Sequence, residues 1–249
     1  MSRTWCRHPQ GSNSNSDGEF PVIGFRILPR LRKVDQRWID AFSGLPVATV
    51  SDAMSRMFAG GCGLRPLHKS GQLCGAALTV RTRPGDNLVL HKALDMAEPG
   101  DVIVVDGGGD VTNALIGELM IAHAKKRGVV GIVIHGAVRD SQAIAEDTFP
   151  VFAQGITHRG PYKDGPGEIN VPVSIGGMVV SPGDLVVGDA DGVVSVSVDD
   201  VEAIHLATSA KYQAELAQME RIQAGQNDRS WVDVALRERG CSIESDTGR

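Results

Sequence analysis

Paired cysteines and histidine metal motifs are missing from this sequence. The four cysteines, Cys6, Cys62, Cys74 and Cys241, stand far apart, without a C-x-x-C pair or the spacing of a zinc site. This pattern predicts reduced thiols and argues against a disulfide framework. The seven histidines contain no H-x-H or H-E-x-x-H, which argues against a transition-metal site.

Long apolar runs and an excess of positive charge are missing too. No segment approaches the roughly 18 apolar residues of a membrane span, and the basic N-terminus has no apolar stretch behind it. The net charge of -5 gives no electrostatic footprint for nucleic acid. These absences predict a cytoplasmic protein that binds neither nucleic acid nor membrane, and they leave room for a small anionic substrate.

What is present is the rhythm of an α/β domain. A strand-like run (101–106), a glycine turn GGGD (107–110), a helix-like segment (114–128) and a second strand-like run (129–136) predict a β-α-β unit. Both strands are continuous apolar runs, as in a sheet covered on both faces. Further helices are expected at residues 34–45, 49–61, 86–98 and 199–225, with a strand at 72–82, short strands from 149 to 198, and a last short helix that Gly240 ends.

The chain shows no internal repeat and no linker. We therefore expect one α/β domain with terminal helices over residues 21–249, preceded by a disordered extension at residues 1–20. Within this domain, Thr49 and Asp52 have the spacing of a helix capping box.

The segment GELM, Gly117 to Met120, is a candidate anion site, because amides at a helix start can hold a carboxylate or phosphate. This requires the helix to begin near Gly117. A start at Asn113 would instead make Gly117 a close-packing residue, and the spacing favours neither start. GGGD resembles a phosphate loop more weakly, because it lacks both G-x-G-x-x-G and G-K-[ST], so a plain turn is favoured.

Arg139 and Asp140 follow the second strand of the unit, in IHGAVRD. Parallel strands place ligands beyond their carboxyl ends, so this pair and GELM are expected at one edge of the sheet. Arginine pairs two-pronged with carboxylates, and aspartate offers a hard oxygen that suits Mg²⁺. Together they could grip a 2-oxo acid. The alternative is a surface ion pair worth at most about 1 kcal/mol.

Four segments carry a family resemblance: HKALDMAEPGDVIVVDGGG, GELM, RGVVGIVIHGAVRD and VPVSIGGMVVSPGDLVVGDADGVVSV. They resemble the RraA-like family, which groups metal-dependent 4-hydroxy-4-methyl-2-oxoglutarate/4-carboxy-4-hydroxy-2-oxoadipate aldolases with the regulator of ribonuclease E activity. The resemblance covers roughly residues 22 to 225. Its most specific part is the joint occurrence of GEL and G-x-V-R-D about 20 residues apart.

The resemblance implies a swivelling β/β/α domain, similar to phosphohistidine domains, that forms a homotrimer or a hexamer with sites at subunit boundaries. It implies that Arg139 and the GELM segment, namely Gly117, Glu118, Leu119 and Met120, bind a pyruvate unit. Asp140 would bind Mg²⁺ or Mn²⁺, and Glu118 would orient a water on the metal, so that Arg139 and Glu118 are the catalytic residues. Glu215, which by its helical position alone belongs to a solvated face, would complete the metal site from a neighbouring subunit. His135 departs from the family pattern, where aldolases often have an acidic residue.

The resemblance also implies the reaction. A class II, divalent-metal-dependent lyase would cleave 4-hydroxy-2-oxo dicarboxylic or tricarboxylic acids, such as 4-hydroxy-4-methyl-2-oxoglutarate, to pyruvate, and would decarboxylate oxaloacetate. A rival is a non-catalytic trimer that binds a ribonuclease. The joint presence of Glu118, Arg139 and Asp140 favours the enzyme. Methyl transfer to a quinone finds no support, because no glycine-rich cofactor motif is present.

Overall fold

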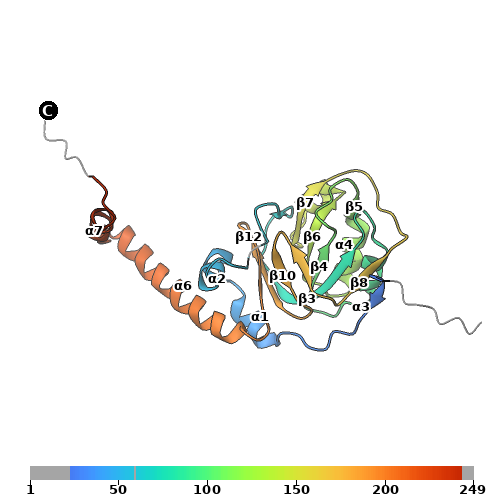
Figure 1. Ribbon diagram of the computed structural model, residues 1–249, viewed down its shortest axis with the longest axis horizontal. Coiled ribbons are helices and arrows are strands. Elements are labelled where there is room, and N and C mark those ends of the chain that lie inside the picture. Colours follow the sequence, from blue (N-terminus) through green and yellow to red (C-terminus); the bar gives the residue numbers. More distant parts are fainter. Residues whose placement is uncertain (1–22, 59, 243–249) are drawn as a thin grey trace, which may run out of the picture.

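The computed structural model describes residues 23–58 and 60–242, so the expected extension at residues 1–20 lies outside the described residues. Figure 1 shows a β-rich body with helices on its faces and one long helix, α6, that runs away from it. The helices are α1 (Gln36–Phe42), α2 (Val47–Ala53), α3 (Leu88–Met96), α4 (Glu118–Lys126), α5 (Ser141–Glu146), α6 (Val201–Gln223) and α7 (Ser230–Glu238). The strands are β1 (Arg26–Ile27), β2 (Arg65–Pro66), β3 (Leu73–Thr82), β4 (Asp101–Asp106), β5 (Ala114–Ile116), β6 (Gly131–Val138), β7 (Val151–Ile156), β8 (Gly167–Ile169), β9 (Val173–Ile175), β10 (Met178–Val180), β11 (Leu185–Asp189) and β12 (Gly192–Val196).

Parallel strands form the middle of the main sheet, in the order β3, β4, β6 and β7. β4 and β6 are almost entirely buried, as their continuous apolar sequences predict. The β11–β12 hairpin joins the sheet at β3 in antiparallel fashion, and β5 pairs with the end of β6. The predicted β-α-β unit is therefore present, with Val104 opposite Val133 in the register of its strands.

Alternate residues of β4 and β6 point to opposite faces of the sheet and pack into two separate hydrophobic cores. Ile103 and Ile132 pack with α3 and α4, whereas Val104 and Val133 pack with the β9–β10 hairpin. Each buried aliphatic side chain of this kind stabilises the fold by about 1.5–3 kcal/mol relative to its exposed form. A third core joins α1, α2 and the first turns of α6 to β11 and β12. Helices, parallel sheet and second β-layer are the expected swivelling β/β/α arrangement.

The expected helix at residues 114–128 is wrong in its first part. Ala114, Leu115 and Ile116 form β5, which pairs with the end of β6, and all three are buried. α4 begins only at Glu118, with Gly117 as its extended N-cap residue. The structure thus decides between the two possible helix starts in favour of Gly117.

The expected capping box at Thr49 and Asp52 is also wrong. α2 begins earlier, at Val47, after an extended Pro46, so Thr49 lies inside the helix. Proline is favoured next to a helix start because a backbone N–H at that place would have no intrahelical acceptor, so proline loses no hydrogen bond there. The Thr49 hydroxyl instead donates a hydrogen bond to the Glu215 carboxylate on α6, at 3.1 Å.

The C-terminal helices agree with the sequence pattern. α6 spans Val201–Gln223, and α7 ends near Gly240, which takes the left-handed conformation with φ +79°. Thr208 of α6 is fully buried, and His205 packs edge-on against Phe42 of α1. Among the described residues, no helix combines the length and the apolar character that crossing a membrane requires.

Candidate active site

The ends of β5 and β6 bring the predicted motifs together. These strands run side by side in parallel, so the segments that follow them leave the same edge of the sheet. α4 follows β5 through Gly117, and Arg139 and Asp140 follow β6. The Arg139 N–H donates to the carbonyl of Ile116 at 3.0 Å and fixes the two segments against each other. Residues about 20 positions apart in sequence therefore share one corner of the molecule.

Asp140 is held in an unusual conformation at this corner. Its φ of 56° lies in the left-handed region, which is costly for a residue with a side chain and is often retained at functional sites. One carboxylate oxygen, Oδ2, accepts the backbone N–H of Glu118 at 2.9 Å. A carboxylate at the first turn of α4 is stabilised by the partial positive charge there. The side chain remains 41% exposed, which leaves it accessible to a ligand.

Position 117 accommodates only glycine, because it lies against the side chains of Arg139 and Asp140. A Cβ at this position would overlap Asp140 Oδ2 and come within 2.9 Å of Arg139 Cγ and 3.0 Å of Arg139 Nε. The backbone of Gly117 is extended, a conformation that any residue can adopt. Glycine is therefore required here because there is no room for a Cβ, and not because of the backbone angles. Both functional side chains thus lie directly on a bare stretch of backbone.

A cavity of about 320 Å³ opens beside Arg139. Its wall carries two cationic side chains, those of Arg139 and Lys163, together with the imidazole of His91, and no carboxylate. The pKa of His91 is lowered, first by partial burial and then by the charge of Lys163. The remaining lining residues are Asn87, Leu115, Ile116, Gly117, Leu119, Met120, Gly160 and Pro161. The cavity is therefore suited to a small molecule with negative charges.

The amides of the GELM segment have different partners. The Glu118 N–H is taken by Asp140, and the Met120 N–H donates to the Gly117 carbonyl at 3.1 Å. The N–H groups of Gly117 and Leu119 have no acceptor among the described residues. These amides can bind a ligand anion together with Arg139.

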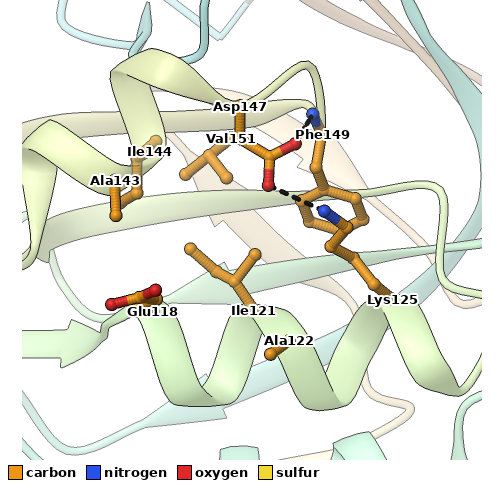
Figure 2. A pocket seen from close by; sticks show the side chains of 9 residues that line it. All are labelled: Glu118, Ile121, Ala122, Lys125, Ala143, Ile144, Asp147, Phe149 and Val151. Carbon is orange, nitrogen blue, oxygen red and sulfur yellow. Dashed lines mark hydrogen bonds and ion pairs between the residues drawn. The ribbon is translucent and has the colours of Figure 1, made fainter.

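The Glu118 side chain points away from that cavity. Figure 2 shows it at one end of a groove between α4 and α5, level with Ala143 and with the ion pair of Lys125 and Asp147 further along. The Glu118 side chain thus lines this groove and not the cavity beside Arg139.

Glu215 lies elsewhere in the same chain. It sits on α6, where it accepts the Thr49 hydroxyl and pairs with Lys211 at 3.3 Å. In Figure 1, α6 and α4 lie on opposite sides of the body. Within one chain, Glu215 and Asp140 therefore do not meet.

His135 and the GGGD turn have a structural explanation. The N–H groups of Gly107 and Gly109 both donate to the His135 carbonyl, each at 3.1 Å, and the Gly108 N–H donates to Asp106. His135 Nδ1 lies 3.2 Å from the same Asp106 carboxylate. These amides are engaged inside the protein, which favours the plain turn over a phosphate cradle.

The sequence did not single out Asn87 and His91, which line the cavity. Both residues could have been predicted from the position of α3. This helix follows β3, and the carboxyl end of β3 lies at the same edge of the sheet as those of β4 and β6. Lys163 belongs to the loop 159–168, RGPYKDGPGE, whose side chains were expected at the far end of the pocket. The structure places Gly160, Pro161 and Lys163 of this loop in the cavity wall.

Asp86 fastens this loop to the start of α3. Its fully buried carboxylate accepts the N–H groups of Leu88, Asp164 and Gly165 at 2.7–2.9 Å. Burial acts to raise the pKa of Asp86, but these hydrogen bonds and the Arg83 charge outweigh it and lower the pKa. The lowered pKa means that the charged carboxylate stabilises the fold.

We expect Asp86→Asn to lower the free energy of unfolding by about 2–3 kcal/mol, because Asp164 and Gly165 lose a charged acceptor. A carboxylate whose folded pKa is depressed stabilises the protein above its unfolded pKa, and this stability is lost as the pH falls through the folded pKa. The wild-type protein should therefore lose stability below about pH 4, and the variant should lose less over that range. Urea unfolding at pH 7 and pH 3.5 checks both statements; equal pH dependence would contradict them.

Comparison with known proteins places the chain in a family. The fold and this corner define a swivelling β/β/α protein with a cavity that has cationic side chains and lies next to a carboxylate. Residues 47–195 match the family model RraA-like, described as Aldolase/RraA, and the chain belongs to this family. A protein of Halalkalibacterium halodurans, named "Putative 4-hydroxy-4-methyl-2-oxoglutarate aldolase", is 41% identical over 184 residues, which cover 74% of this chain and 87% of that one.

Solved structures agree on the fold. RraAS2 of Streptomyces coelicolor, described as an unusual member of the RNase ES inhibitor RraA family, has a TM-score of 0.67 at 27% identity, covering 76% of this chain and 98% of its own. The RNA-processing inhibitor RraA of Thermus thermophilus has a TM-score of 0.56 at 30% identity, covering 61% and 92%. The family thus contains proteins named for two different activities, an aldolase and an inhibitor of RNA processing. The residues of the site are therefore the basis for choosing between these functions.

Proposed function

We propose that this protein is a lyase that cleaves 4-hydroxy-2-oxo acids with two or three carboxylates, such as 4-hydroxy-4-methyl-2-oxoglutarate, to release pyruvate. One observation carries the proposal: Arg139 and Asp140 lie on the bare backbone of Gly117, beside a cavity that has two cationic side chains, Arg139 and Lys163, and no carboxylate. The name of the Halalkalibacterium halodurans relative supports the reaction class. A protein that only binds another protein has no need of this arrangement.

The donor set suits Mg²⁺ or Mn²⁺. Within the described residues, no three His, Cys, Asp or Glu side chains converge on a possible metal position. Asp140 is a half-exposed carboxylate with a hard oxygen. Mg²⁺ is commonly bound by one or two carboxylates while it keeps several waters, whereas zinc needs three or four protein ligands. Asp140 would hold the ion, which when bound withdraws electrons from the 2-oxo group of the substrate.

The chain's own residues supply the remaining chemistry. Arg139 and the Leu119 N–H bind the carboxylate and the oxygen on which negative charge develops as the C3–C4 bond breaks. The electrons of that bond pass to the 2-oxo group, which gives the enolate of pyruvate, and C3 then takes up a proton. Glu118 receives the proton of the C4 hydroxyl through a water molecule on the Asp140 side. Oxaloacetate decarboxylation forms the same enolate and is proposed as a second activity.

Glu215 is proposed to act from a neighbouring copy in a homotrimer or a hexamer. It cannot reach Asp140 of its own chain, as α6 and α4 lie on opposite sides of the body. Its carboxylate is 45% exposed on a helix that leaves that body, so a neighbouring copy can approach it. It would serve as a second carboxylate for the metal.

The cleavage assay tests the proposal. With 4-hydroxy-4-methyl-2-oxoglutarate and Mg²⁺, we expect pyruvate release, measured by coupling to lactate dehydrogenase. A chelator should lower the rate by at least about 10²-fold, and added Mg²⁺ or Mn²⁺ should restore it. Pyruvate release that is unaffected by the chelator would refute the role of the metal. No release with any divalent metal would refute the lyase.

A further inference from the structure

A second cavity lies where α6 begins, between Met54, Asp184 and Ile204; it is here called the α6-base cavity. It has a volume of about 290 Å³ and shares no lining residue with the cavity beside Arg139. Its walls come from the segment after α2, from β10 and β12, from the turn before β11 and from the first turn of α6. In Figure 1 these elements lie together on the side of the body from which α6 leaves.

One wall of the α6-base cavity is apolar. Met54 and Val196 are buried there, and Ile204 is partly buried against the same core. Phe58 and Val179 also line the cavity but are 50% and 56% exposed, so they border its opening. An aliphatic or aromatic group that enters here leaves water for an apolar surface, which favours binding.

Ser195 is the buried polar group that this cavity leaves without a partner. The residue is 4% exposed, and its hydroxyl makes no hydrogen bond among the described residues. Buried hydroxyls in native proteins nearly always have a partner, because an unsatisfied one costs stability. Ser195 lines the cavity, so a ligand with a hydrogen-bonding group can supply the missing bond.

The charged side chains of the cavity have one sign. Asp184 and Asp200 line it, and no lysine, arginine or histidine does. Asp184 is 8% exposed, and its carboxylate accepts the Ser181 N–H at 2.8 Å and the Val198 N–H at 3.3 Å. Burial raises the pKa of Asp184 in spite of these bonds, because it penalises the charged form. A cation in the cavity would offset that penalty.

The start of α6 does not reverse this preference. A helix N-terminus has partial positive charge, but Asp200 and Glu202 already complement it. Asp199 forms an ion pair with Arg32, whereas Asp200 forms no ion pair among the described residues. The Asp200 carboxylate is therefore available to a ligand cation.

We propose that the α6-base cavity binds a small organic ammonium compound, with an apolar body and one protonated amine. The body packs against Met54, Phe58 and Ile204, and the amine lies by the Asp184 and Asp200 carboxylates. An ammonium group has three N–H donors and no acceptor, which matches two carboxylates and the Ser195 hydroxyl. Such charge-assisted hydrogen bonds are stronger than neutral ones. This binding site is separate from the proposed lyase site and does not depend on it.

Calorimetric titration of the full-length wild-type protein at pH 7 tests the chemical class. The probes are 2-phenylethylamine and hexylamine, which carry an aromatic and an aliphatic body. At least one should bind at one site per chain, at least about tenfold more tightly than 2-phenylethanol, 1-hexanol or 3-phenylpropanoate. No binding of either amine, or equal binding of the amines and the alcohols, overturns the proposal.

Ser195→Ala tests the unpartnered hydroxyl. The free variant should unfold at the same temperature as the wild type or higher, because a buried group without a partner is removed, while Kd for the amine rises about fivefold. Thr208→Val is the matched control: the Thr208 hydroxyl is also buried and unpartnered among the described residues, but Thr208 does not line the cavity. An unchanged Kd in Ser195→Ala, or an equal rise in Thr208→Val, contradicts the assignment.

Ala203→Leu tests the place of binding independently. Ala203 is exposed in the first turn of α6 and lines the cavity, so leucine fills part of it, and leucine is a good helix former. Ala207→Leu is the control, because Ala207 lies one turn further on, is also exposed and stands outside the cavity. Amine binding should weaken at least about tenfold in the first variant only. Full binding by Ala203→Leu would place the amine elsewhere and overturn the proposal.

Discussion

Replacing Arg139 by alanine is expected to lower kcat/KM for cleavage of 4-hydroxy-4-methyl-2-oxoglutarate by at least about 10³-fold, close to 4 kcal/mol of transition-state stabilisation. Arg139 lies on Gly117 and lines the cavity, so in the proposed reaction it would face the oxygen on which charge develops. Arg139→Lys should recover little, since an ammonium cannot pair two-pronged with a carboxylate. Steady-state kinetics with the lactate dehydrogenase assay measures all three proteins.

Arg159→Ala is the matched control for this variant. Arg159 lies in the next loop, is exposed, and does not line the cavity. It should keep kcat/KM within about threefold of the wild type, because an exposed charge outside the cavity contributes little. If Arg139→Ala also stays within that range, Arg139 does not bind the reacting anion and the assignment of the site fails.

Replacing Gly117 by alanine should lower kcat by about 10²-fold with little change in stability. The added Cβ overlaps Asp140 Oδ2 and crowds Arg139, so both side chains have to swing away from the backbone. They are 41% and 43% exposed and can move without disturbing the core. A displacement of about 1 Å at reacting groups can cost this much in rate. Thermal unfolding and kinetics together separate the two effects.

Gly63→Ala provides the comparison. A Cβ there meets only the flexible amide end of Gln154, at 3.1 Å, and Gly63 is not part of the cavity. Its kinetics should match the wild type. A Gly117→Ala variant that is as active as Gly63→Ala would show that Arg139 and Asp140 need not lie where the structure has them.

The sequence predicted the parts of the fold that depend on local pattern. β4 and β6 were visible because buried parallel strands are continuous apolar runs, and α6 because charged residues mark its start. β5 was missed because Ala114–Ile116 continues the apolar spacing of α4. Only its pairing with β6, a contact between distant residues, makes it a strand. The capping box at Thr49 was wrongly predicted for a related reason, since the Thr49 hydroxyl has its hydrogen-bond partner on the distant helix α6.

The site divides in the same way. Gly117, Arg139 and Asp140 could be predicted to meet because the segments that hold them follow the two parallel strands of the β-α-β unit, whose carboxyl ends share one edge. The engagement of the Glu118 N–H by Asp140, and the position of the Glu118 side chain in a separate groove, depend on the left-handed turn at Asp140. No short pattern in the sequence encodes that turn. His91 and Lys163 reach the cavity from distant segments and needed the fold to be found.

The central claim is that Asp140 and Arg139, with a divalent metal, stabilise the enolate of pyruvate. Exchange of the pyruvate methyl protons with D₂O, followed by ¹H NMR, tests this most directly, because it needs no aldol substrate. We expect exchange with Mg²⁺ that stops when a chelator is added and that falls at least about 10²-fold in Arg139→Ala. Absence of exchange with every divalent metal, or exchange unchanged in Arg139→Ala, would contradict it.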